Sequence, residues 1–239
     1  MRRPKAMKLR GYGCGVNFLA AAAAVALVAL AAISAGAGTC CGKYVRERIY
    51  VIPSDGADDK AARALRDGLS AAIPVTSGVE TSRARALPAP AYDGPRKQYD
   101  ASAVIDSISR DITLALTNER AVVMTGADLY VPGADFVYGA ADGKKGVAIV
   151  SLARLRNEFR GLKPDDRLLR QRALKVALRQ LGRSWGMQDC PAAKCVMNGS
   201  DRIEDIDRKR ETFCYRCSAL VERRSDGETL MGPAIRKMT

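Results

Sequence analysis

Four cysteines in the last quarter of the chain constrain its fold more than any other feature. They form two closely spaced pairs, C-x4-C at Cys190 and Cys195 and C-x2-C at Cys214 and Cys217, joined by a polar loop. Close pairs of this kind are typical of a structural zinc site, in which four thiolates surround the ion in a tetrahedron. The sequence therefore predicts one structural zinc ion held by these four residues.

Two other interpretations of the same cysteines stay open. A pair of disulfides is one alternative, because an oxidising compartment permits disulfide formation. A redox role for Cys214-Tyr-Arg-Cys217 is the other. It is weaker than zinc or disulfides, because the pair lacks the βαβ context of redox folds.

A helix is predicted directly before the cysteines, from Arg167 to Trp185. Its apolar residues recur every three or four positions, which places one stripe of the helix against a core. These residues are Leu169, Ala173, Val176, Ala177, Leu181 and Trp185. Arg179 and Arg183 are four positions apart and therefore share a face of the helix. Gly186 is expected to end the helix in a left-handed turn, after which the chain reverses toward Asp189.

This region resembles the zinc-binding signature of the archaemetzincin family, H-E-x-x-H-x-x-G-x-x-H-C-x4-C-x-M followed by C-x2-C. Gly186, Met197 and the four cysteines fix the register. Other segments are similar to the same family, namely IYVIP (49–53), AYDGPRKQYDASAVIDSI (91–108), ADLYVPGADFVYGAADGKKGVAIVSLARL (127–155) and MNGSDRIEDIDRKRETFCYRC (197–217). Because separated blocks match, the resemblance is specific, and it covers roughly residues 48 to 223.

The resemblance also shows where this chain departs from the family. Arg179, Arg183 and Asp189 stand at the three zinc-binding His positions, and Gln180 stands at the position of the general-base Glu. The chain contains no His. Arginine has no lone pair to give to a metal, and an amide does not titrate in the range that a general base needs. The resemblance therefore implies a degenerate member with no catalytic residues and no catalytic zinc.

The family's geometry also implies what the changed residues do. It brings the three ligand positions together, so Asp189 is expected to lie between the guanidinium groups of Arg179 and Arg183. One carboxylate leaves one of the two positive charges uncompensated. We therefore expect an anion site at Arg179 and Arg183, for which a peptide carboxyl terminus and a phosphate are candidates. Met197 occupies the family's Met-turn position and, without a metal above it, is expected to be a core residue.

The amino terminus contains one long uncharged segment. Residues 1–17 form a basic flank, and 18–39 carry no charge. As a helix, 18–39 would span about 33 Å, enough for a bilayer core of about 30 Å. This pattern predicts a transmembrane anchor or uncleaved signal, with the amino terminus cytoplasmic and the domain extracytoplasmic. Ala35-Gly36-Ala37 offers a cleavage site, so secretion after signal cleavage is the alternative.

The fold expected from pattern and resemblance is α+β, preceded by one N-terminal hydrophobic helix. A linker at 40–47 leads to a zincin-like domain at 48–224, with a mixed twisted sheet, an active-site-type helix and the zinc-stabilised C-terminal region. Residues 225–239 are expected to be a flexible tail. Helices are expected at 58–72 and 101–112. Strands are expected at 49–53, 114–116, 121–124, 135–138 and 147–152, with the last two joined by a loop around residues 142 and 143.

Charge and composition limit the partners. The formal net charge is +13, and only 5% of residues are aromatic. Because no nucleic-acid motif is present, nucleic acid is not expected as a partner. The basic residues are expected to form a solvated face or to meet a membrane surface. The leading hypothesis is a membrane-anchored, archaemetzincin-like pseudopeptidase that binds a peptide or protein. The alternatives are an active zinc metallopeptidase with an unrecognised ligand set, and a decayed domain without selected activity.

Overall fold

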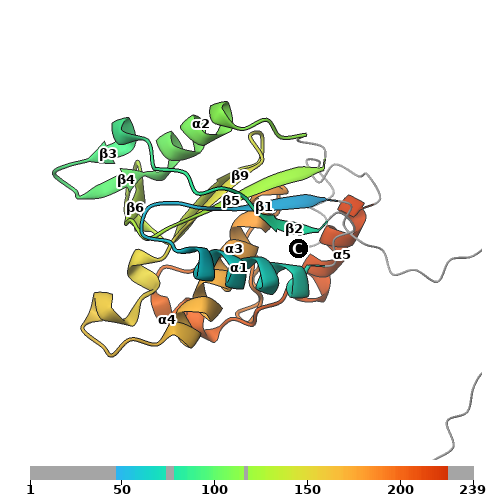
Figure 1. Cartoon of the computed structure of the whole chain (residues 1–239). Coiled ribbons are helices and arrows are strands. Elements are labelled where there is room, and N and C mark those ends of the chain that lie inside the picture. The colour runs from blue at the N-terminus through green and yellow to red at the C-terminus, as the bar shows by residue number, and fades with distance from the viewer. Residues whose placement is uncertain (1–46, 74–77, 116–117, 226–239) are drawn as a thin grey trace, which may run out of the picture. The chain divides into compact units, whose positions relative to one another are not determined.

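The computed structural model describes residues 47–73, 78–115 and 118–225. Within these ranges the chain forms two sheets and several helices (Figure 1). The predicted basic flank, the hydrophobic helix at 18–39 and the tail beyond residue 225 lie outside the described residues, as does nearly all of the predicted linker.

The central sheet has five strands in the order β2-β1-β5-β9-β8. Their bounds are β1 Arg48–Pro53, β2 Val79–Thr81, β5 Glu119–Thr125, β8 Gly139–Asp142 and β9 Val147–Ser151. The pairs among β2, β1, β5 and β9 are parallel, and β8 pairs with β9 in the antiparallel direction. The expected mixed sheet is therefore confirmed.

Helices cover both faces of this sheet, with α2 on one face and α1 and α3 on the other (Figure 1). Their bounds are α1 Asp59–Ala72, α2 Ala101–Asp111 and α3 Asp166–Ser184. The alternation of side chains along β5 explains the two layers. Val122 and Met124 lie in the core with α1 and α3, whereas Ala121 and Val123 lie in the core with α2. Strands buried on both faces read as continuous apolar runs, as β5 and β9 do.

A second, four-stranded sheet has the order β3-β4-β6-β7, so β7 is one of its edges. The strands are β3 Tyr92–Asp93, β4 Gln98–Asp100, β6 Leu129–Val131 and β7 Ala134–Val137. The predicted strand at 135–138 is thus present as β7, but its predicted hairpin with 147–152 is wrong. The partner of β9 is β8, because Gly139 lets the two backbones approach: a Cβ at Gly139 would lie 2.5 Å from the carbonyl oxygen of Ile149. The described part of 114–116 is not a strand.

The last part of the chain contains the short helix α4 (Ile203–Arg208) and α5 (Tyr215–Ser225). Arg172 joins α3 to α4. Its Nε and Nη2 donate to the two carboxylate oxygens of Asp207 at 2.7 and 2.6 Å, and its Nη1 donates to the carbonyl oxygen of Leu155 at 2.9 Å. Arg172, Lys175 and Lys209 are buried. The expectation that the basic residues form a solvated face is therefore wrong for these three.

The predicted membrane location is corrected by the structure. Among the described residues, no helix has both the length and the apolar character needed to cross a membrane. The segment on which the prediction depended, 18–39, lies outside the described residues. The membrane-anchored location is therefore withdrawn.

Candidate functional site

The four predicted metal ligands lie together at the C-terminal side of α3. We call Cys190, Cys195, Cys214 and Cys217 the thiol cluster. Their sulfur atoms all lie within 4.8 Å of one another. Cys190 and Cys195 come from the loop after α3, Cys214 directly precedes α5, and Cys217 lies in the first turn of α5. The cluster therefore joins two segments of chain, and within the described ranges it is the one group of Cys, Asp and Glu side chains placed to share a metal ion.

The spacing of the sulfur atoms suits zinc better than disulfides. A tetrahedral ion with Zn–S bonds of about 2.3 Å separates its sulfur atoms by about 3.8 Å. The Sγ atoms of Cys190 and Cys214 are 3.7 Å apart, and all four thiols are free. A disulfide would require a separation of about 2.05 Å. The donor set and its geometry thus fit a structural zinc ion.

The thiol cluster also contains a group that ionises readily. The hydrogen bond from Cys217 lowers the pKa of Cys195 to about 5, and the backbone N–H of Cys214 donates to the same sulfur at 3.4 Å. The hydrogen bond between Cys217 and Cys195 raises the pKa of Cys217, and burial raises the pKa of Cys190. Because zinc binds thiolates, Cys195 is already in the form that a metal ion needs.

Arg179, Arg183 and Asp189 also lie together, and we call them the guanidinium cluster. Arg179 Nη2 donates to Asp189 Oδ1 at 2.7 Å, and Arg183 Nη1 lies 3.8 Å from the same oxygen. The two arginines are one helical turn apart on α3. Gly186, at φ 85°, turns the chain back toward Asp189, and its N–H donates to the carbonyl oxygen of Arg183 at 2.9 Å. One carboxylate oxygen therefore faces two cations.

Two other residues named from the family resemblance, Met197 and Gln180, are buried. Met197 is fully buried, and it packs so closely on α3 that a Cβ at Gly182 would lie 2.3 Å from its sulfur. Gln180 is 4% exposed and faces Gly139 of β8. Met197 and Gln180 therefore help to fix the position of α3 against the following loop and the sheet.

A cavity of about 380 Å³ lies next to the guanidinium cluster. Its walls are β7 with the start of β8, one face of α3, and residues from 200 to 209. Arg179 and Gln180 line it, whereas Arg183 does not. The predicted anion site is thus divided, because only one of its two arginines borders the cavity.

Two lysines that the sequence did not single out line the cavity. Lys175 Nζ donates to the carbonyl oxygen of Asp207 at 3.1 Å, and Lys209 Nζ donates to the carbonyl oxygens of Val196 and Asn198. Burial, together with the positive charge of Arg179, lowers the pKa of Lys209 to about 8. The position of Lys175 could have been recognised, because it precedes Arg179 by four residues on a predicted helix. Lys209 reaches the cavity through tertiary packing, for which the sequence gives no local signal.

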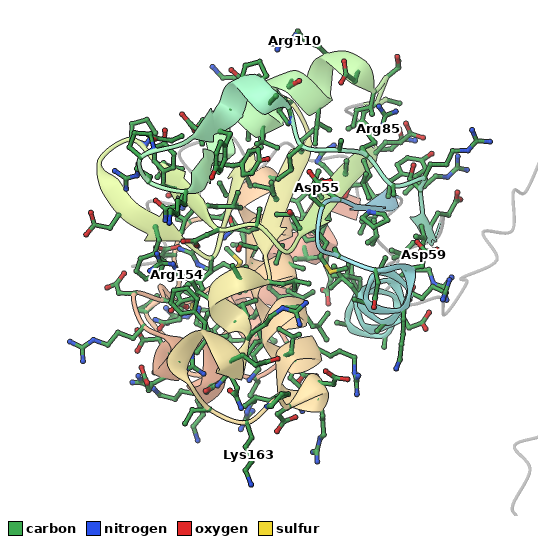
Figure 2. The ribbon with its side chains drawn as sticks, turned by 60° about the vertical axis from the view of Figure 1, so that its left-hand side comes forward. Asp55, Asp59, Arg85, Arg110, Arg154 and Lys163 are labelled. Carbon is green, nitrogen blue, oxygen red and sulfur yellow. The ribbon has the colours of Figure 1, made fainter. Side chains whose placement is uncertain are left out.

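Arg154 holds the aromatic wall of the cavity in place. Its guanidinium group pairs with Asp128 at 2.8 Å and lies over the ring of Phe136, 4.1 Å from the centroid. Figure 2 shows Arg154 where the four-stranded sheet meets the 3-10 helices η2 (Ala153–Leu155) and η3 (Asn157–Arg160). Phe136 in turn packs edge to face on Tyr138, with ring centroids 5.3 Å apart. Burial raises the pKa of Tyr138, so its hydroxyl stays neutral at physiological pH.

Comparison with known proteins gives consistent matches over the described domain. The family model for peptidase family M54 matches residues 90–223, which is more than half of the chain. The archaemetzincin of Pyrococcus furiosus is 39% identical over 137 residues, which cover 56% of this chain and 69% of that protein.

Solved structures give the same result. A zinc-dependent peptidase from Methanocorpusculum labreanum superposes with a TM-score of 0.65 and 30% identity, covering 72% of this chain and 99% of that one. The archaemetzincin from Methanopyrus kandleri superposes with a TM-score of 0.64 and 32% identity, covering 76% and 97%. The likeness therefore extends beyond the cysteines to the whole described domain.

Proposed function

This chain belongs to peptidase family M54, and from that premise we propose that it is a peptide- or protein-binding domain that carries one structural zinc ion and does not hydrolyse its ligand. The single observation that carries the proposal is the guanidinium cluster, in which an ion pair occupies the positions of the family's catalytic ligands.

The guanidinium cluster does not fit a catalytic zinc ion. Such a site needs three protein ligands with lone pairs and an open position for water. Arg179 and Arg183 have none to give, and Oδ1 of Asp189 is already engaged by both arginines. Gln180 cannot take a proton from water, because an amide is not a base at neutral pH. No hydrolytic step can therefore be written through these residues by the mechanism that the family's motif implies.

The thiol cluster fits a structural ion, and we assign the zinc to it. Four thiolates leave no open position for water or substrate. The ion would contribute to folding by holding the loop after α3 to α5. This role does not depend on the guanidinium cluster, so the loss of the catalytic ligands leaves it intact.

The cavity beside β7 supports a binding role. Clefts of about 300–1,000 Å³ with apolar walls and a few polar groups are typical ligand sites, and the cavity of about 380 Å³ lies in that range. β7 is an edge strand of its sheet and lines the cavity, so its backbone can pair with an extended peptide. A peptide is therefore the ligand that we expect the cavity to accept.

The test is to measure cleavage and binding on the same sample. The full chain, loaded with zinc, is incubated with unfolded casein and a peptide library across neutral pH, and products are sought by mass spectrometry. Binding to immobilised peptides is measured in parallel. We expect binding without cleavage. A chelator-sensitive cleavage that is lost in Asp189→Ala would instead support an active enzyme with an unrecognised ligand set, and neither binding nor cleavage would support a decayed domain.

A further inference from the structure

The inner part of the cavity has more positive groups than carboxylates to match them. Arg179 shares the Asp189 carboxylate with Arg183, and the ammonium groups of Lys175 and Lys209 donate to backbone carbonyl oxygens. The two carboxylates that line the cavity, those of Asp135 and Asp201, belong to exposed residues. Arg179, Lys175 and Lys209, which line the cavity, therefore carry more positive charge than the Asp189 carboxylate can match.

Two buried polar atoms at this cavity have no hydrogen-bond partner in the described part of the chain. They are Nε of Arg179 and Oγ of Ser200, and both residues line the cavity. A buried donor without a partner costs free energy, and most such groups in native proteins are satisfied. A ligand with negatively charged oxygens would bring acceptors to the cavity that these two residues line.

Much of the remaining lining of the cavity is apolar or aromatic. Val176 of α3 and Ile206 of α4 are buried, and on the β7 side Phe136 packs edge to face on Tyr138. The guanidinium group of Arg154 lies over the ring of Phe136 and restricts its orientation. A small inorganic anion would leave this lining uncovered, whereas an apolar side chain next to the anionic group would cover it.

We propose that the cavity binds the carboxyl-terminal residue of a peptide that ends in an apolar side chain. The terminal carboxylate accepts hydrogen bonds from Arg179 and Ser200, with Lys175 adding positive charge. The last side chain packs on Phe136, Tyr138 and the apolar residues of α3. This proposal rests on the proposed peptide-binding function and adds which end of the peptide is recognised and by which groups.

The experiment compares peptides that differ only at their carboxyl end. A fluorescent peptide with C-terminal Leu is prepared as the free acid and as the amide, and each is titrated with the zinc-loaded full chain by anisotropy. Hydrogen bonds to a charged group contribute roughly 1.5–3 kcal/mol, so we expect the acid to bind at least about tenfold more tightly. Arg179→Met and Ser200→Ala should each reduce this ratio. Arg170→Met, at an exposed arginine of the same helix, is the matched control and should leave the ratio unchanged.

The outcomes separate this inference from the proposed function. Equal binding of acid and amide would overturn the carboxylate site while leaving peptide binding in place. Failure of both peptides and of a wider peptide library to bind would overturn the proposed function itself. Inorganic phosphate that displaces the acid at micromolar concentration, with no preference for apolar last residues, would show a free-anion site and would also overturn the inference.

Discussion

The thiol cluster and the guanidinium cluster are adjacent in the chain, at Cys190 and Asp189, but differ in what they can bind. The thiol cluster keeps four donors within 4.8 Å of one another. The guanidinium cluster offers one carboxylate, and two arginines already face it. The two sites therefore depend on different contacts. The first joins the loop after α3 to α5, and the second joins α3 to the start of that loop, so one can change without the other.

The largest effect that we predict follows from removing one thiol. Cys217→Ser should lose the zinc ion and several kcal/mol of stability, because the free energy of binding a structural zinc is part of the free energy of folding. Metal analysis and thermal unfolding of the purified chain measure both. The unaltered chain should contain one zinc, and Cys41→Ser, the same change at a cysteine that is not one of the four, should retain it. Two zinc ions in the unaltered chain, or none together with no free thiols, would contradict the assignment.

The second prediction reverses the change in the guanidinium cluster. Arg179→His, Gln180→Glu, Arg183→His and Asp189→His in one chain should raise the zinc content from one ion to two, because three imidazoles on this backbone supply the ligands that the arginines lack. Metal analysis measures the content. A chain with only Gln180→Glu and Asp189→His keeps both arginines and should stay at one. A folded fourfold variant that also stays at one would show that the local backbone has lost the family's geometry.

The features that could be predicted from the sequence are those fixed by local spacing. The apolar stripe of α3 predicts its bounds to within a residue at each end. The cysteine spacing predicts which four residues form the thiol cluster. The three positions of the guanidinium cluster follow from the family resemblance, in the register set by Gly186, Met197 and the four cysteines.

The features that escaped prediction depend on tertiary contacts. β8 consists of Gly139-Ala-Ala-Asp142, which carries no β-branched or aromatic residue, and it is a strand because its backbone pairs with β9. Lys209 and Ser200 reach the cavity from segments whose local sequence indicates only turns and caps. The burial of Arg172 depends on Asp207, which lies 35 positions away. A pattern read along the chain cannot register contacts of this kind.

The third prediction contrasts a buried arginine of α3 with an exposed arginine of the same helix. Arg172→Met should cost about 2–3 kcal/mol, because it leaves the Asp207 carboxylate and the Leu155 carbonyl without their donor. The value is below the roughly 3–5 kcal/mol of a fully buried pair, since the Asp207 side chain is 35% exposed. Denaturant unfolding measures the change, and Arg170→Met should stay within about 0.5 kcal/mol of the unaltered chain. Equal effects of the two substitutions would mean that the Arg172 contacts add little to stability.

The smallest predicted effect tests whether the guanidinium cluster is a bonded unit. Arg179→Met, Asp189→Ala and the double variant form a cycle whose coupling free energy reports their interaction alone. We expect about 0.5–1 kcal/mol, because the 2.7 Å bond joins a mostly buried arginine to an aspartate that is 52% exposed and therefore screened by water. The single change Asp189→Ala should lower the unfolding temperature slightly, and added salt should reduce the coupling. If Asp189→Ala leaves the unfolding temperature unchanged and the coupling is zero, the ion pair does not tie α3 to the loop, and the two clusters would differ only in their affinity for metal.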